Sequence, residues 1–180
     1  MALKQQKFPS SVIKVGAVLF QVTAYYHEGK TCVDVDEWHV KSIRKRRGSQ
    51  TKNGFNVPVY LRNDQVYVNL IAKIEGVTWV RLSRKVGDIG WSPSIPANFR
   101  KQFAVGQELP LGIYTTKLQA FKYALESSIE YISNLNIRLE SELNTVDREE
   151  YEQELHEEQL IIKTLKSQIT RLNNKSKLKK

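Results

Sequence analysis

Hydrophobic and polar residues follow two different periods along this chain, and the change falls near residue 115. From residue 12 to residue 85 the two kinds of residue alternate in several runs, whereas after residue 115 apolar residues recur every three or four positions. Alternation predicts half-buried β-strands, and the longer spacing predicts amphipathic helices. Short turns separate the strand-like runs, which favours antiparallel pairing. The expected fold class is therefore α+β, with an antiparallel β-rich N-terminal domain followed by a C-terminal α-helical hairpin.

The best-defined strand pair surrounds a turn. Residues 18–26 alternate regularly, and the turn at residues 27–30 contains a glycine that can adopt a positive φ. In the strand that follows, the apolar phase slips by one position between Val35 and Trp38. We expect a β-bulge near residues 36–37, because one extra residue in a strand re-aims the side chains that follow it.

Further strands complete the β-rich part. Their alternation predicts strands at residues 57–61, 66–71 and 77–84. Glycine and proline residues punctuate residues 85–111, which predicts a connecting region. One short helix is expected within this region, at residues 97–103.

Two amphipathic helices are expected after this region. Thr115 or Thr116 can cap the first, whose apolar residues recur as far as Leu143. Asp147, followed three positions later by Glu150, resembles a capping box and predicts the start of the second helix. The second helix keeps a spacing of four and three along one apolar stripe with a single charged member: Tyr151, Leu155, Glu158, Ile162, Leu165, Ile169 and Leu172.

A short connection between the two helices predicts an antiparallel helical hairpin. Its apolar surface is wider than a coiled-coil seam, because Leu160 and Ile161 flank the second stripe and Ile137 lies off the first. The surplus apolar surface is expected to dock on the β-rich part or on a second copy of the chain. We expect a homodimer or a higher homo-oligomer.

Charge separates the same two parts of the chain. Residues 1–114 hold 17 Lys and Arg against 8 Asp and Glu, a net charge of +9, and residues 115–180 hold 11 against 11. The predicted domains are a basic antiparallel β domain at residues 8–114, an α-helical hairpin at 115–174 and a basic flexible tail at 175–180. Since the whole surplus lies in the β domain, its expected partner is a polyanion.

The densest cationic segment covers residues 41–52, where six of twelve residues are basic and none is acidic. Such a cluster repels itself unless a polyanion neutralises it, and phosphate backbones are the commonest polyanion in a cell. A localisation signal or a solvated loop has the same composition. This segment, however, lies between predicted strands, as the rim of a binding sheet does. The predicted phosphate contacts are Lys41, Arg44, Lys45, Arg46, Arg47 and Lys52, extended by Arg81, Arg84, Lys85, Arg100 and Lys101.

Aromatic residues on the predicted strands suggest how bases are held. Sheets that bind single strands combine exposed aromatic rings, which stack on bases, with cations that follow the phosphates. About half of the aromatic residues are expected in the core. Tyr25, Trp38 and Tyr67 are the predicted stacking platforms, because their neighbours in phase are polar.

Several kinds of chemistry lack a motif in this sequence. A single Cys32 excludes an intramolecular disulfide, and the three His residues have no zinc-binding spacing. Neither a phosphate-binding glycine–lysine loop nor a dinucleotide fingerprint occurs. We therefore expect a protein that is not an enzyme and needs no cofactor or metal. No signal peptide or membrane span is recognisable, so a soluble intracellular protein is expected.

The segment from Gly29 to Trp38, with its Gly-Lys turn and acidic and aromatic end followed by basic residues, resembles the Whirly and transcriptional-coactivator type of single-stranded nucleic-acid-binding domain. The similarity covers residues 12–130, in which antiparallel strands lead into a long helix. The architecture also resembles the nucleus-associated messenger-RNA-binding proteins of jumbo bacteriophages. That resemblance implies binding of phage transcripts in the cytoplasm of an infected bacterium, in association with a phage nucleus.

Together these features predict a non-enzymatic protein that binds single-stranded RNA, or single-stranded DNA, with low sequence specificity and self-associates through its helical hairpin. Two alternatives stay open. The first is a phage-encoded interaction factor or inhibitor whose basic loop binds an acidic host protein. The second is a metal-dependent nuclease that uses Asp34 and Asp36.

Overall fold

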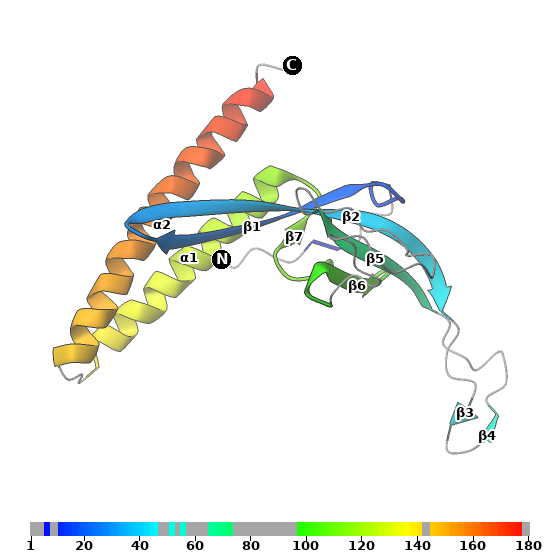
Figure 1. Cartoon of the computed structure of the whole chain (residues 1–180), viewed down its shortest axis with the longest axis horizontal. Coiled ribbons are helices and arrows are strands. Elements are labelled where there is room, and N and C mark those ends of the chain that lie inside the picture. The colour runs from blue at the N-terminus through cyan, green and yellow to red at the C-terminus, as the bar shows by residue number, and fades with distance from the viewer. Residues whose placement is uncertain are drawn as a thin grey trace, which may run out of the picture. The chain divides into compact units, whose positions relative to one another are not determined.

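The described residues form a five-stranded antiparallel sheet and a separate pair of short strands, followed by two α-helices in the C-terminal part of the chain (Figure 1). The computed structural model describes residues 6–7, 11–46, 51–52, 55–56, 65–73, 97–141 and 145–177. The five-stranded sheet has the order β6-β5-β2-β1-β7, with β1 (Val18–His27), β2 (Lys30–Arg46), β5 (Gln65–Lys73), β6 (Arg100–Ala104) and β7 (Ile113–Tyr114). The helices are α1 (Lys117–Leu139) and α2 (Thr145–Lys177), and two short strands, β3 (Thr51–Lys52) and β4 (Phe55–Asn56), pair with each other. This arrangement confirms the predicted α+β fold class.

Contacts divide the chain into two compact units. Unit 1 contains Phe20–Asp36 and Gly112–Lys180, and unit 2 contains Gln5–Leu19 and Glu37–Leu111. Strand β2 therefore belongs to unit 1 before Glu37 and to unit 2 from Glu37 onward. The predicted domain boundaries at residues 114/115 and 174/175 follow the change of hydrophobic period along the sequence, and they stay a prediction.

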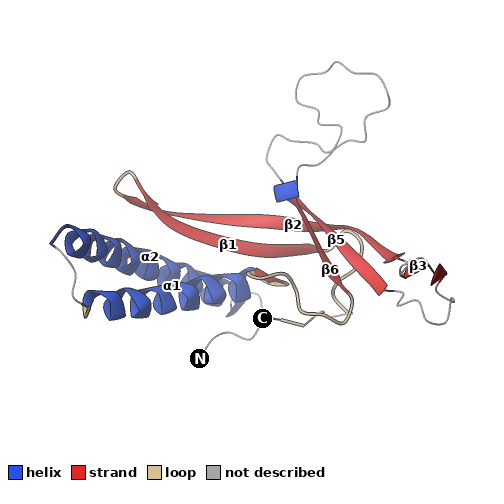
Figure 2. Cartoon of the chain, turned by 90° about the horizontal axis from the view of Figure 1, so that it is seen from below, coloured by secondary structure: helices blue, strands red, loops and turns tan. Residues whose placement is uncertain are grey.

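In unit 1 the helical hairpin packs against the β1–β2 hairpin (Figure 2). The core of this unit contains Leu165 of α2, which is fully buried, together with Phe121 of α1 and Val22 of β1. Val33 and Val35 of β2 pack on the same cluster. The surplus apolar surface of the helices was expected to dock on the β-rich part or on a second copy of the chain. The structure shows it packed on the β-strands.

The turn between β1 and β2 lies at the predicted residues. Glu28 and Gly29 both adopt positive φ, 49° and 77°. Two successive positive φ values are what a tight type I′ hairpin requires, because this turn matches the right-handed twist of its strands. The glycine at the second position adopts its φ without steric cost.

Both helix starts depend on local capping, and the structure confirms one prediction and corrects the other. Thr116 caps α1, and its side-chain oxygen accepts a hydrogen bond from the backbone N–H of Gln119 at 3.3 Å. Helix α2 begins at Thr145, so the capping box predicted at Asp147 is wrong. Asp147 lies instead in the first turn, where a carboxylate interacts favourably with the helix dipole. At the other end α2 reaches Lys177, past the predicted end of the hairpin at residue 174.

The buried stripe of α2 is shifted relative to the predicted one. Ile161, expected beside the stripe, is only 4% exposed, whereas Ile162 is half-buried. The shift arises because α2 packs on the strands as well as on α1, so its buried face is broader than a two-helix seam. Ile137 of α1, which lies off the predicted stripe, is 63% exposed.

A buried hydroxyl in unit 1 provides a test of this packing. Tyr114 is 2% exposed, and its hydroxyl has no hydrogen-bond partner among the described residues. Burial is the main cause that raises its pKa to about 12. Tyr114→Phe removes the unpaired hydroxyl but keeps the ring, so we expect the free energy of unfolding near neutral pH to rise by about 1 kcal/mol.

The same residue makes the wild-type protein sensitive to alkali. Because the folded-state pKa of Tyr114 lies above the ordinary value of 10.0, the unfolded chain loses this proton first. Stability is therefore expected to fall as pH rises from 10.0 towards about 12, and the variant should lack this contribution. Urea unfolding of both proteins near neutral pH and at alkaline pH measures it. If Tyr114→Phe were less stable than the wild type near neutral pH, the Tyr114 hydroxyl would have to form a stabilising hydrogen bond.

In unit 2 the second half of β2 pairs with β5, and β5 pairs with β6, all antiparallel. The helix predicted at residues 97–103 is wrong beyond its first turn: a 3₁₀ turn, η2 (Ala97–Phe99), leads directly into β6. Pairing with β5 prevails because it buries Phe103 and Ala104, which are 6% and 1% exposed. A helix of so few residues has little stability of its own.

The β-bulge also differs from its predicted place near residues 36–37. Pairing of β2 with β5 is regular from Glu37 to Val40 and shifts between Val40 and Ser42, so Lys41 is the extra residue. The apolar phase slip has another cause: Val35 packs on the unit 1 core, whereas Trp38 is buried in unit 2. Each part of this long strand buries residues of different parity, and no insertion is needed at that point. The strands predicted at residues 57–61 and 77–84 lie outside the described residues.

Candidate nucleic-acid interface

The register of three strands in unit 2 brings polar side chains to one side of the sheet. Directly opposed residues of an antiparallel pair point to the same side. The pairing puts Ser42, Asn69 and Gln102 in one row across β2, β5 and β6, and it puts Arg44 opposite Tyr67. We define the polar face as eight residues of this side: His39, Ser42, Arg44, Tyr67, Asn69, Ile71, Arg100 and Gln102. Ala104, opposite Tyr67, lies on the same side and is buried.

Hydrogen bonds hold the central row of the polar face. The Asn69 side-chain amide donates to Ser42 Oγ at 3.1 Å, and the Gln102 amide donates to Asn69 Oδ1 at 2.9 Å. The row therefore links three strands through side chains as well as through backbone pairing. Gln102 is exposed, and Ser42 and Asn69 are half-buried. A fixed row of this kind leaves amide groups at the surface that can donate to and accept from a ligand.

The bulge at Lys41 determines which cation joins this face. In a regular strand Arg44 would lie on the same side as Val40, which is 2% exposed and part of the core. The extra residue reverses the alternation, so Arg44 follows His39 and Ser42 onto the polar face, opposite Tyr67. The bulge thus places Arg44 on the polar face, where a regular strand would place Ile43.

Two cations and one aromatic ring lie ready for contact on the polar face. Arg44 and Arg100 are exposed, and neither forms an ion pair with another described residue. The Tyr67 ring is half-buried, and its hydroxyl donates to Gln65 Oε1 at 3.2 Å. A guanidinium opposite a tyrosine ring provides a charge for a phosphate and a surface for a base.

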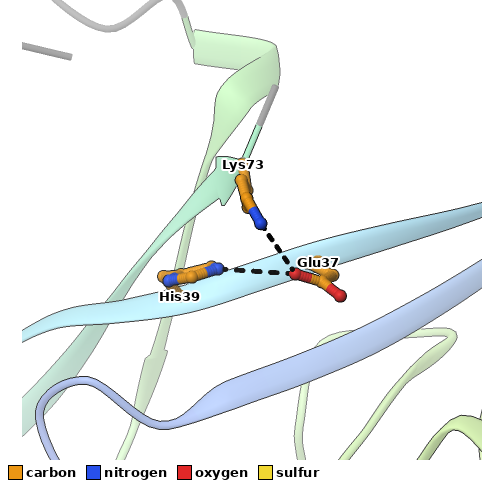
Figure 3. Close-up of polar contacts among 3 residues, drawn as sticks. All are labelled: Glu37, His39 and Lys73. Atoms are coloured by element: carbon orange, nitrogen blue, oxygen red, sulfur yellow. Dashed lines mark ion pairs between the residues drawn. The ribbon is translucent and has the colours of Figure 1, made fainter. Parts of the chain in front are cut away.

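An acidic residue marks the end of the polar face. Glu37 Oε2 lies 3.5 Å from the Lys73 ammonium and 3.8 Å from His39 Nε2, as Figure 3 shows. The distance to His39 is too long for a hydrogen bond, and the buried Nε2 atom has no hydrogen-bond partner among the described residues. Glu37 and Lys73 neutralise each other in part, so the free positive charge of the face is concentrated at Arg44 and Arg100.

Trp38 is buried, so the prediction that its ring stacks on a base is wrong. It is 4% exposed and lies on the other side of β2 from His39. Its ring packs under Lys101, whose Nζ atom is 4.4 Å from the ring centroid. The prediction was wrong because alternation identifies two sides of a strand but not which side is buried. Lys101, a predicted phosphate contact, is thereby held in a cation–π contact.

Tyr25 is the third predicted platform, and it belongs to unit 1. It is 41% exposed. A hydrogen bond to Asp34, followed by the negative charge of the same residue, raises its pKa. Its ring is accessible, but Tyr25 and the polar face belong to different units.

The remaining predicted contacts fall into three groups. Lys41 at the bulge and Lys45 are exposed, and Lys45 shares the side of Ile43 rather than that of Arg44. Arg46 pairs with Gln65, and Lys52 pairs with Phe55, through their backbones. The predicted contacts that lie outside the described residues are Arg47, Arg81, Arg84 and Lys85.

Sequence patterns did not identify the polar row. Gln102 was expected in a helix, and Ser42 follows a bulge that alternation placed elsewhere. Only Asn69 could have been placed from the sequence, because it shares one side of an alternating strand with Tyr67 and Ile71.

Metal-binding clusters and membrane-spanning helices were sought among the described residues. Within the described ranges, no group of three or more His, Cys, Asp or Glu side chains is arranged to hold a metal ion. No helix in the same ranges is long and apolar enough to cross a membrane.

Comparison with known proteins gives no relative for this arrangement. We searched family models, curated proteins and solved structures, and nothing matches the chain.

Proposed function

We propose that the protein binds single-stranded nucleic acid, most readily RNA, on the polar face of unit 2. The proposal rests on the placement of two exposed arginines, Arg44 and Arg100, and the half-buried ring of Tyr67 on one side of three paired strands. Binding is not enzymatic, requires no cofactor and has little sequence specificity, because stacking and phosphate contacts recognise every base alike.

Each part of the polar face has a distinct role in this proposal. Arg44 and Arg100 contact phosphates, and the Tyr67 ring stacks on a base. Asn69 and Gln102 adapt to whichever base edge is presented, since amide groups both donate and accept hydrogen bonds, and they therefore select no particular base. Lys41, exposed at the bulge, adds a cation next to this face, whereas Lys45 lies on the other side of β2. The net charge of +9 strengthens the encounter with a polyanion.

Salt dependence tests this function. Binding of a fluorescent single-stranded RNA is expected to weaken steeply as salt rises, with log affinity falling by about 0.7 per log unit of salt for each phosphate contact. Fluorescence anisotropy at several salt concentrations measures the slope. Single-stranded DNA and duplex RNA of the same length are the comparison ligands. Weak binding of every single strand at low salt would overturn the proposal.

A different partner for the same charges is an acidic host protein. Copurification before and after nuclease treatment separates the two cases. If the binding function is right, nucleic acid should copurify and nuclease should remove it. One stoichiometric protein that stays bound after nuclease treatment would favour the interaction factor instead.

Self-association through the helical hairpin is part of the same proposal. The apolar side chains that a second copy would cover are exposed on α1 and at the start of α2: Ile129, Ile137 and Val146 are 48%, 63% and 72% exposed. Two copies would bring two polar faces to one strand, which raises affinity by raising the effective concentration of the second site.

A further inference from the structure

The closed end of the β1–β2 hairpin lies beside α2 in unit 1 (Figure 1), and residues of both line a pocket of about 490 Å³. Its lining residues are Tyr26, Gly29 and Thr31 from the hairpin and Leu160, Lys163, Thr164, Ser167, Gln168 and Arg171 from α2. The helical residues recur every three or four positions and thus form one continuous side of α2. The volume is within the range of small-molecule sites and is large enough for a single nucleotide.

The lining of this pocket is positively charged. Lys163 and Arg171 lie two turns apart on α2, and both are exposed. None of the lining residues is acidic. Neither cation forms an ion pair with another residue of the described ranges. Two cations with no acidic residue in the lining favour an anionic ligand.

Neutral groups in the same lining are mostly free to donate hydrogen bonds. The Thr164 hydroxyl is engaged, because it donates to the Leu160 carbonyl at 3.0 Å. The hydroxyls of Thr31 and Ser167 and the amide of Gln168 have no hydrogen-bond partner among the described residues. The ring of Tyr26 packs against the unit 1 core, which fixes that wall of the pocket.

We propose that this pocket binds the phosphate group of a nucleotide, either free or at the end of a strand. Ser167 lies one turn from Lys163 and one turn from Arg171, which are about 12 Å apart along the axis of α2, so a phosphate near Ser167 is within reach of both long side chains. Each terminal oxygen of a phosphate accepts hydrogen bonds from charged and neutral donors alike. Arginine binds phosphate through two parallel hydrogen bonds, and lysine adds a point charge. This site lies in unit 1, so it is separate from the polar face of unit 2 and does not depend on the function proposed for that face.

Binding of adenosine monophosphate to the full chain tests the site. Isothermal titration calorimetry should show binding by the wild type and a loss of about tenfold for Lys163→Gln and for Arg171→Gln, because each removes a hydrogen bond to a charged group. Lys166→Gln is the matched control: Lys166 is exposed on the same helix, outside the pocket lining, and should keep the wild-type affinity. Glutamine and lysine have similar helix propensities, so these variants are expected to fold.

Two further ligands identify the source of the phosphate. Tighter binding of an RNA oligonucleotide with a 5′-phosphate than of its 5′-hydroxyl form, lost in Arg171→Gln, would assign the pocket to a strand end. Binding of adenosine monophosphate with no such difference would assign it to free nucleotides. If Lys163→Gln and Arg171→Gln bind both phosphorylated ligands as the wild type does, or if the wild type binds neither, the proposal is overturned. Adenosine monophosphate binding by a wild type that binds no 5′-hydroxyl single-stranded RNA would show that the polar face fails while this site holds.

Discussion

Replacing Arg44 and Arg100 together by glutamate is expected to lower the affinity for single-stranded RNA by at least about 100-fold, since each hydrogen bond to a charged group contributes about 1.5–3 kcal/mol. Both side chains are exposed on the polar face. Reversal removes two phosphate contacts and adds repulsion. The loss should be similar for all sequences, because phosphates carry no sequence information.

The salt dependence of this double variant separates a lost contact from a distorted fold. Losing two phosphate contacts should reduce the slope of log affinity against log salt by about 1.4. Lys14→Glu is the matched control, because Lys14 is an exposed cation of unit 2 and is not among the predicted contacts. A loss of binding free energy in Lys14→Glu that is half the loss in the double variant, and thus equal per reversed charge, would mean that net charge, and not the polar face, determines binding.

Trp38→Ala is expected to lower the free energy of unfolding by about 3–5 kcal/mol, because removal of a buried aromatic side chain leaves a cavity in the core. The Trp38 ring is 4% exposed, and its centroid lies 4.4 Å from the Lys101 ammonium. The substitution also removes this cation–π contact. Urea unfolding followed by circular dichroism measures the change. Tyr25→Ala is the comparison, since its ring is 41% exposed and its removal should cost about 1 kcal/mol or less.

RNA affinity of Trp38→Ala, measured where the variant is still folded, tests the corrected role of this residue. The affinity should match that of the wild type, because the ring lies on the side of β2 opposite His39. A variant with wild-type stability but weak RNA binding would show instead that Trp38 stacks on a base.

Patterns among neighbouring residues correctly predicted the secondary-structure elements that depend on neighbouring residues. The β1–β2 turn needs two residues with positive φ and contains a glycine at the second, and Thr116 caps α1 through a hydrogen bond three residues away. Alternation predicted β1 and β5, and the spacing of apolar residues predicted both helices. Their ends were less accurate, because Asp147 and Thr145 both suit the start of a helix and packing decides between them.

The candidate site depends on pairing between distant segments, which no local pattern contains. Asn69 is 27 residues from Ser42 and 33 residues from Gln102, yet their side chains form one hydrogen-bonded row. Arg100 reaches the polar face only because residues 100–104 pair with β5 instead of forming a helix. The pocket in unit 1 likewise needs α2 to lie beside a hairpin far away in sequence.

The sequence by itself determined the α+β class, the position of the first hairpin, the two helices and the basic surplus of residues 1–114, because periodicity, turn residues and charge are properties of neighbouring residues. Only the tertiary structure decided that Trp38 is buried while Arg44 is exposed, and that Lys163 and Arg171 line a pocket. The physical reason is that alternation fixes two sides of a strand, whereas the side that is buried depends on what packs there. One bulged residue, Lys41, then reversed the sides for the rest of β2.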